Sequence, residues 1–165
     1  MKNRLDCFRR GLDNSLLCVC GAALFVLVIA VTWQVFSRYI LNDPSSFTDE
    51  LARYTMIWLG LLGASYLFGK NGHLAITLLP ESLPRQYKRF LLTLIHLLSL
   101  AFVSLAMIKG GLALISRTWH QFSPSLQLPM AYVYTILPLA GSLMALYIIL
   151  NVVEMFCSDQ NNDLT

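Results

Sequence analysis

Four long stretches of the sequence contain no charged residue, and they limit what this chain can fold into more than any other feature. They cover residues 14–37, 54–69, 90–108 and 118–153. A helix needs about 20 mostly apolar residues to cross the hydrocarbon core of a membrane. The composition agrees, because 56% of the residues are hydrophobic and 13% are charged, whereas a soluble domain has roughly 25% charged residues. The pattern predicts an all-α integral membrane protein with four transmembrane helices.

The expected boundaries follow from the charges and from the helix-breaking residues. We expect one membrane domain, residues 1–165, with spans near residues 14–41, 48–69, 84–116 and 129–155. The first helix should begin near Leu12 and stop before Pro44, because the residue before a proline disfavours the helical conformation. The apolar residues 74–79 are too few to cross a membrane and are expected to lie at its surface, between the second and third helices.

The Lys and Arg residues of the short loops predict the orientation, since these residues are enriched on the cytoplasmic side. With four spans, one side of the membrane carries Lys2, Arg4, Arg9, Arg10, Lys70, Arg85, Lys88 and Arg89. The other side carries Arg38, Arg53, Lys109 and Arg117. This excess predicts that both termini lie in the cytoplasm.

Several charged residues lie near the expected start of the second helix. Ser46 is expected to be the N-cap, with Asp49 at capping-box spacing. Glu50 and Arg53 are three residues apart on one helix face, so we expect them to pair. Together with Arg38 across the hairpin, the cluster indicates either a contact surface for another subunit or a clasp between the first two helices. The alternative is a simple helix cap whose arginines reach water.

Small residues and prolines mark expected packing positions. Gly60 and Ala64 form one pair of small residues four positions apart, and Gly141 and Ala145 form another. Such pairs let a second helix approach closely. Pro138 lies inside the expected fourth helix and predicts a kink there.

The sequence does not favour catalysis or a cofactor. A haem needs two axial ligands that face each other, but His73, His96 and His120 are expected at three different depths. No catalytic triad, phosphate-binding loop or mid-span carboxylate is visible, so we expect neither an enzyme nor a self-sufficient pump. No bound metal is expected, and a net charge of +3 gives no reason to expect nucleic-acid binding.

One stretch of the sequence resembles a known family. Arg38-Tyr39, the run Phe47-Thr48-Asp49-Glu50-Leu51-Ala52-Arg53-Tyr54, Trp58 and Gly63 resemble the small membrane subunit of tripartite ATP-independent periplasmic (TRAP) transporters, the DctQ-like family. Weaker matches follow in order at Gly72-His73, Ser123-Pro124, Leu128-Pro129, Tyr134 and Pro138. Asp49 stands where the family often has Glu, and Thr77 where many members have Asp.

The resemblance implies a function that the residues alone do not give. It implies a small permease subunit of the bacterial inner membrane that braces a large multi-span subunit, which moves substrate with sodium. It also implies a periplasmic binding protein that delivers an organic acid, such as sialic acid, a sugar acid or a C4-dicarboxylate. The resemblance also places Tyr54 and Trp58 in the candidate subunit interface.

Three other classes of protein remain as alternatives. The first is the membrane-anchor subunit of a haem or quinone oxidoreductase, which haem absorbance in the purified protein would indicate. The second is a small transporter that acts alone, and the third is a purely structural protein with four spans.

Overall fold

The computed structural model describes residues 2–70 and 85–160, with the side chains of residues 7, 9–70 and 91–152. Its elements are α1 (Lys2–Tyr39), α2 (Ser46–Gly69), α4 (Arg85–Phe102), the π-helix η2 (Val103–Lys109), α5 (Gly110–Thr118), α6 (Met130–Tyr134) and α7 (Ile136–Gln160). All of these described elements are helical, and an isolated β-bridge joins Phe122 to Pro129. The predicted surface segment, residues 74–79, lies outside the described residues.

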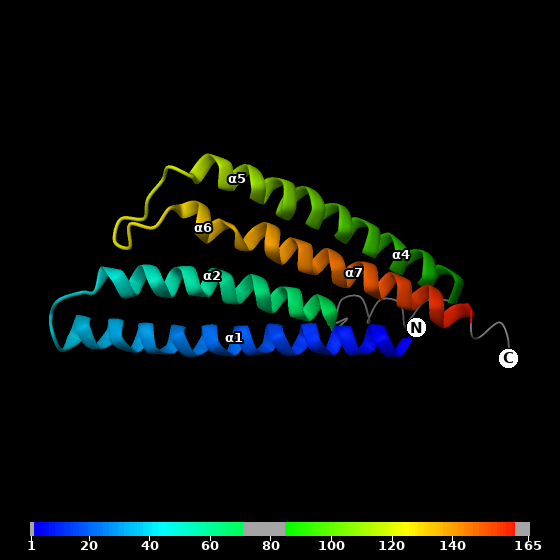
Figure 1. Ribbon diagram of the computed structural model, residues 1–165, viewed down its shortest axis with the longest axis horizontal. Coiled ribbons are helices and arrows are strands. Elements are labelled where there is room, and N and C mark those ends of the chain that lie inside the picture. The colour runs from blue at the N-terminus through cyan, green and yellow to red at the C-terminus, as the bar shows by residue number, and fades with distance from the viewer. Residues whose placement is uncertain (1, 71–84, 161–165) are drawn as a thin grey trace.

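The helices form two long hairpins that lie side by side. One hairpin is α1 with α2, and the other is the continuous α4–η2–α5 helix with α6 and α7 (Figure 1). α1 begins and α7 ends at the same end of the molecule, which we call the terminus end. The opposite end holds the connections after α1 and after α5, and we call it the loop end (Figure 1).

Three of the described helical stretches are long and apolar enough to cross a membrane. They are Arg9–Tyr39, Leu91–Thr118 and Met130–Val152, with mean hydropathies of 2.7, 2.4 and 2.0. α2, the predicted second span, is also a helix of 24 residues. It is less apolar than these three stretches, because glycines, hydroxyl residues and Arg53 are interspersed among its apolar side chains.

The starts of α1 and α2 differ from the predicted ones. α1 already begins at Lys2, well before the expected start near Leu12, since no proline or glycine pair interrupts residues 2–12. The N-cap of α2 is Ser45, and its side chain makes no capping hydrogen bond, so the prediction that Ser46 caps the helix through its side chain was wrong.

The last span is interrupted at Thr135, between α6 and α7. Pro138 follows three residues later and has no N–H to donate to the Tyr134 carbonyl.

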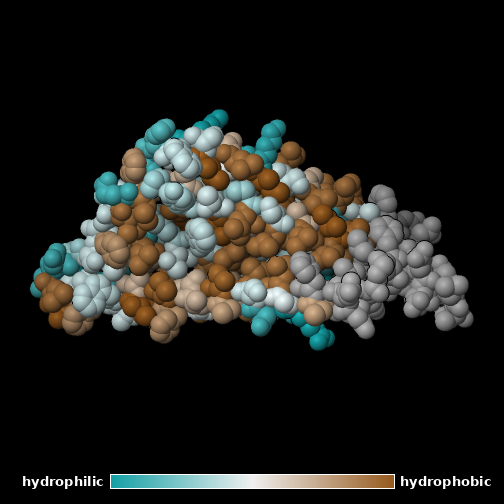
Figure 2. Space-filling view, viewed as in Figure 1, coloured by the Kyte–Doolittle hydropathy of each residue, from teal (hydrophilic) through white to brown (hydrophobic). Residues whose placement is uncertain are grey.

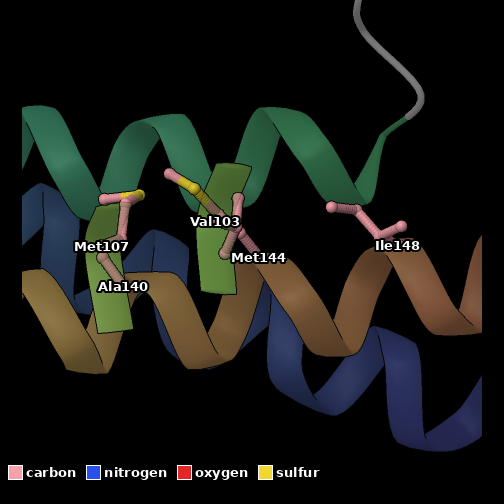
Figure 3. Packing of buried hydrophobic residues seen from close by; sticks show 5 residues of the cluster. All are labelled: Val103, Met107, Ala140, Met144 and Ile148. Atoms are coloured by element: carbon pink, nitrogen blue, oxygen red, sulfur yellow. The ribbon is translucent and has the colours of Figure 1, made fainter. Parts of the chain in front are cut away.

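The core lies where α7 packs against η2 and α2. Its main cluster consists of Val103, Met107, Ala140, Met144 and Ile148. In Figure 3, Met107 and Val103 of η2 lie beside Ala140 and Met144 of α7, with α2 alongside. A second cluster joins α1, α2 and α7 through Leu16, Leu62, Ile136 and Tyr147.

Glycines allow the closest helix contacts. A Cβ atom at Gly141 would lie 2.9 Å from the Cβ of Met107, so α7 can approach η2 only without a side chain there. Ala145 packs at the edge of the same cluster, as does Ala64. Gly60 is different, because a Cβ there would meet nothing within 4 Å. Within the described residues no helix comes close to Gly60, so the predicted close approach there stays a prediction about a partner.

Most of the remaining surface is apolar. Large hydrophobic side chains are exposed along α1 and along α4–α5, including Phe25, Ile29, Leu98 and Leu105. Figure 2 shows hydrophobic residues over the middle of one face and hydrophilic residues mainly at its edges. Such a surface is suited to lipid or to another membrane protein.

Candidate functional site

The carboxylate of Glu50 is the centre of the loop end. It lies in the first turns of α2 and is buried. It accepts hydrogen bonds from the Ser123 hydroxyl, from the Ser125 backbone N–H at 3.1 Å and from the Leu126 backbone N–H at 3.0 Å. Hydrogen bonds to a charged acceptor are stronger than those between neutral groups. Glu50 therefore joins α2 to a loop more than 70 residues away in the chain.

The loop that Glu50 binds, residues 119–129, is folded on itself. The Ser123 N–H donates to the Leu128 carbonyl at 2.9 Å, and the Met130 N–H donates to the Gln121 carbonyl at 2.8 Å. Gln127 adopts a positive φ of 52°, which reverses the chain direction. The carboxylate satisfies the two N–H groups that this turn leaves pointing inward, so the loop and Glu50 depend on each other.

Asp49 and Arg53 form a second, more exposed contact. The Arg53 guanidinium lies 2.9 Å from the Asp49 carboxylate, and the two side chains are 66% and 49% exposed. The Gln34 amide of α1 donates to the other Asp49 oxygen at 2.9 Å. Asp49 therefore clasps α1 to α2, although an exposed ion pair of this kind contributes under about 1 kcal/mol.

Within the described chain, the predicted cluster differs from the structure in two details, and its role at a subunit interface stays a prediction. We expected Glu50 to pair with Arg53, but Arg53 donates to Asp49 and Glu50 binds the loop instead. We also expected Arg38 in the cluster. Its side chain is exposed, and it forms neither a hydrogen bond nor an ion pair with the part of the chain that the structure describes.

The two aromatic residues of the resemblance join α2 to α6. The Trp58 indole N–H donates to the Val133 carbonyl at 3.2 Å. The Tyr54 hydroxyl lies 3.4 Å from the Met130 sulfur, a weak acceptor. Glu50, Tyr54 and Trp58 thus follow one side of α2 and hold the second hairpin against it.

A second polar cluster at the terminus end was not predicted. The buried carboxylate of Asp13 accepts a hydrogen bond of 2.6 Å from the Tyr147 hydroxyl and lies 3.3 Å from the Lys70 ammonium. Arg9 donates to the Gly69 carbonyl and, at 3.1 Å, to the Asn151 side chain. These contacts join α1, α2 and α7. A polar Asn151 inside the last uncharged stretch was the signal that could have indicated them.

The histidines make no common site in the described part of the chain. The His96 ring lies 2.7 Å from the Leu92 carbonyl of its own helix. His120 is exposed at the loop end, and His73 lies outside the described residues. Within the described residues, no group of three or more His, Cys, Asp or Glu side chains could hold a metal ion.

Long apolar helices joined by polar contacts at both ends define the general class, an all-helical multi-pass membrane protein. Residues 27–158 match the family model of the tripartite ATP-independent periplasmic transporters, DctQ component. The chain belongs to this family. It is a transporter component of the bacterial inner membrane and not an enzyme, which argues against an oxidoreductase anchor.

Individual relatives agree with the family match. The chain is 28% identical over 143 residues to a TRAP transporter small permease protein of Haemophilus influenzae, covering 87% of this chain and 88% of that protein. It is 26% identical over 106 residues to the sialic acid TRAP transporter small permease protein SiaQ of Vibrio cholerae, covering 64% and 61%. It is also 24% identical over 131 residues to the isethionate TRAP transporter permease protein DctMQ of Oleidesulfovibrio alaskensis, covering 75% of this chain and 21% of that protein.

Proposed function

We propose that this chain is the small permease subunit that braces a large multi-span permease in a sodium-coupled TRAP transporter. The observation that carries this is the match to the isethionate permease DctMQ. Three quarters of this chain align with about a fifth of that protein. The rest of that protein is long enough to supply a large multi-span permease within the same polypeptide. We infer that in this protein the large permease is a separate chain with the same contacts.

The proposed cargo is an organic acid that a periplasmic binding protein delivers. Among the relatives, SiaQ and DctMQ are named for sialic acid and for isethionate, both of which are anionic organic compounds. An acid of this kind, such as sialic acid, a sugar acid or a C4-dicarboxylate, fits the family best. Substrate contacts are expected on the other two proteins and not on this chain.

We also propose that α2 crosses the membrane as a fourth span and that both termini lie in the cytoplasm. α1 begins and α7 ends at the same end of the molecule (Figure 1). An odd number of crossings would separate these two ends. The 24 residues of α2 extend about 36 Å, enough to cross the roughly 30 Å hydrocarbon core. The excess of Lys and Arg on the side of the termini supports the orientation.

Cysteine labelling tests this topology. In a variant without native cysteines, an impermeant thiol reagent added to intact spheroplasts should label Ser45→Cys and leave Asn161→Cys unlabelled. Labelling of position 161 from outside would refute the proposed orientation.

Reconstitution tests the function. Vesicles with a sodium gradient should take up the organic acid only when they contain this chain, the large permease and the binding protein together. Vesicles with this chain alone should take up none, and vesicles that lack this chain serve as the matched control. Equal uptake with and without this chain would contradict the proposed bracing role.

A further inference from the structure

A groove of about 630 Å³ opens at the loop end between the two hairpins. Its α2 wall includes Arg53, Tyr54 and Ile57, and its opposite wall includes Phe122, Met130 and Val133. At this end α5 packs on α6 and does not cover α2 (Figure 1). Nearer the terminus end the same flank of α2 is covered, because Ala64 and Phe68 pack against the η2–α7 cluster. The groove is therefore the uncovered half of one flank of α2.

The walls of this groove are held at a fixed separation. The Trp58 indole bonds to the Val133 carbonyl, and Glu50 holds the loop that carries Phe122. Neither wall can move away from the other without breaking these contacts. The groove is thus formed before anything binds, which lowers the entropic cost of binding.

The position and lining of the groove select the kind of occupant. Ile57 lies 11 residues after the start of α2, about 16 Å along the helix. With α2 as a span, this part of the groove lies inside the membrane, where a soluble protein does not reach. Aromatic residues, Met and Arg are the types enriched in the cores of protein interfaces.

The charges at the mouth of the groove also favour a segment of another membrane protein as the occupant. The Glu50 carboxylate is occupied by donors from the loop. Arg53 pairs with Asp49 through one guanidinium nitrogen and is 66% exposed, so the guanidinium can also meet a partner at the mouth. An acidic side chain, or the C-terminal end of a helix, would complement it.

We propose that this groove is the docking site for a membrane-spanning segment of the large permease, an inference that rests on the function proposed above. The segment inserts bulky apolar side chains against Ile57 and Val133. It places an acidic group or a helix C-terminus beside Arg53. The relative DctMQ, in which the matched region is part of a much longer permease, is consistent with a permanent contact of this kind.

Photo-crosslinking in the complete transporter tests the docking site. The photoreactive residue p-benzoylphenylalanine is introduced at Ile57 in the groove or at Ile29 on α1, which are 37% and 54% exposed. Illumination of membranes should crosslink position 57 to the large permease at least about fivefold more than position 29. Equal yields at the two positions, or adducts of position 57 with a second copy of this chain or with lipid only, would overturn the proposal.

Filling the groove gives an independent measurement. Ile57→Trp should reduce the large permease that co-purifies with the tagged chain by about tenfold, whereas Ile29→Trp should change it less than twofold. The thermal stability of each purified variant shows whether the chain still folds. Normal co-purification of a folded Ile57→Trp variant overturns the docking site alone. Absence of the large permease from the wild-type preparation overturns the proposed function and the docking site together.

Discussion

Replacing Tyr147 with Phe tests the polar cluster at the terminus end most directly. The substitution removes only the hydroxyl that donates to Asp13 at 2.6 Å. The ring remains, and with it the packing against Gly69, where even an added Cβ would lie 2.6 Å from a ring carbon. Any loss of stability therefore reports the hydrogen bond and not a cavity.

The size of the effect follows from the partners that remain. A hydrogen bond to a charged group contributes about 1.5–3 kcal/mol in soluble proteins, whereas contacts between membrane helices average about 0.6 kcal/mol. Asp13 keeps Lys70 at 3.3 Å, but the Lys70 side chain is 53% exposed and compensates only in part. We expect Tyr147→Phe to lower the free energy of unfolding by about 1.5 kcal/mol, within the range these values span.

The assay is unfolding of the purified chain in mixed micelles with increasing fractions of SDS, followed by far-ultraviolet circular dichroism. Tyr39→Phe is the matched control, because Tyr39 is 75% exposed, and its effect should stay within about 0.5 kcal/mol. Combining Tyr147→Phe with Asp13→Asn should cost less than the sum of the two changes, since both remove the same contact. Additive effects, or a Tyr147→Phe variant as stable as the control, would refute this account of the cluster.

Two further predictions concern the loop end and the core. Glu50→Gln replaces one acceptor oxygen with a donor, so amide hydrogen exchange at Ser125 and Leu126 should become at least about tenfold faster. The control Asp49→Asn should leave this exchange unchanged. Unaltered exchange in Glu50→Gln would contradict the assigned role of Glu50. Gly141→Leu forces a side chain into η2 and should sharply reduce the yield of folded protein, whereas Gly21→Leu, with nothing within 4 Å of its Cβ, should be tolerated. Similar yields for the two variants would show that the close approach of α7 to η2 is dispensable.

The sequence predicted local features well and distant contacts poorly. Hydropathy and charge located the long helices, because each depends on a continuous stretch of residues. Arg53 does form an ion pair within its own helix, but with Asp49 at i,i+4 spacing. The predicted pair of Glu50 with Arg53 was wrong, because Glu50 accepts hydrogen bonds from a distant loop. Spacing along one helix cannot reveal such a loop.

The terminus-end cluster shows the same limit. Asp13 directly precedes the first uncharged stretch, and Tyr147 lies inside the last one. Their contact depends on how α1 and α7 lie relative to each other, which no periodicity in either helix specifies. The π-helix η2 was also not predicted, and it lies where Gly141 of α7 comes close to Met107.

The distribution of polar contacts between the hairpins follows from the cost of charge in a membrane. A charged residue at the centre of a span costs about 2.5–3.5 kcal/mol or more, and this cost falls toward the interfaces. Asp13 and Glu50, the buried carboxylates of the described chain, lie at opposite ends of the helices. Between them the hairpins are joined by apolar packing, by glycine contacts and by the Ser65 hydroxyl, 3.2 Å from the Ala140 carbonyl. Because each end is fixed by directional bonds, rotation of one hairpin against the other would break at least one buried carboxylate contact. The chain is therefore built as a rigid unit, which suits the bracing role proposed above.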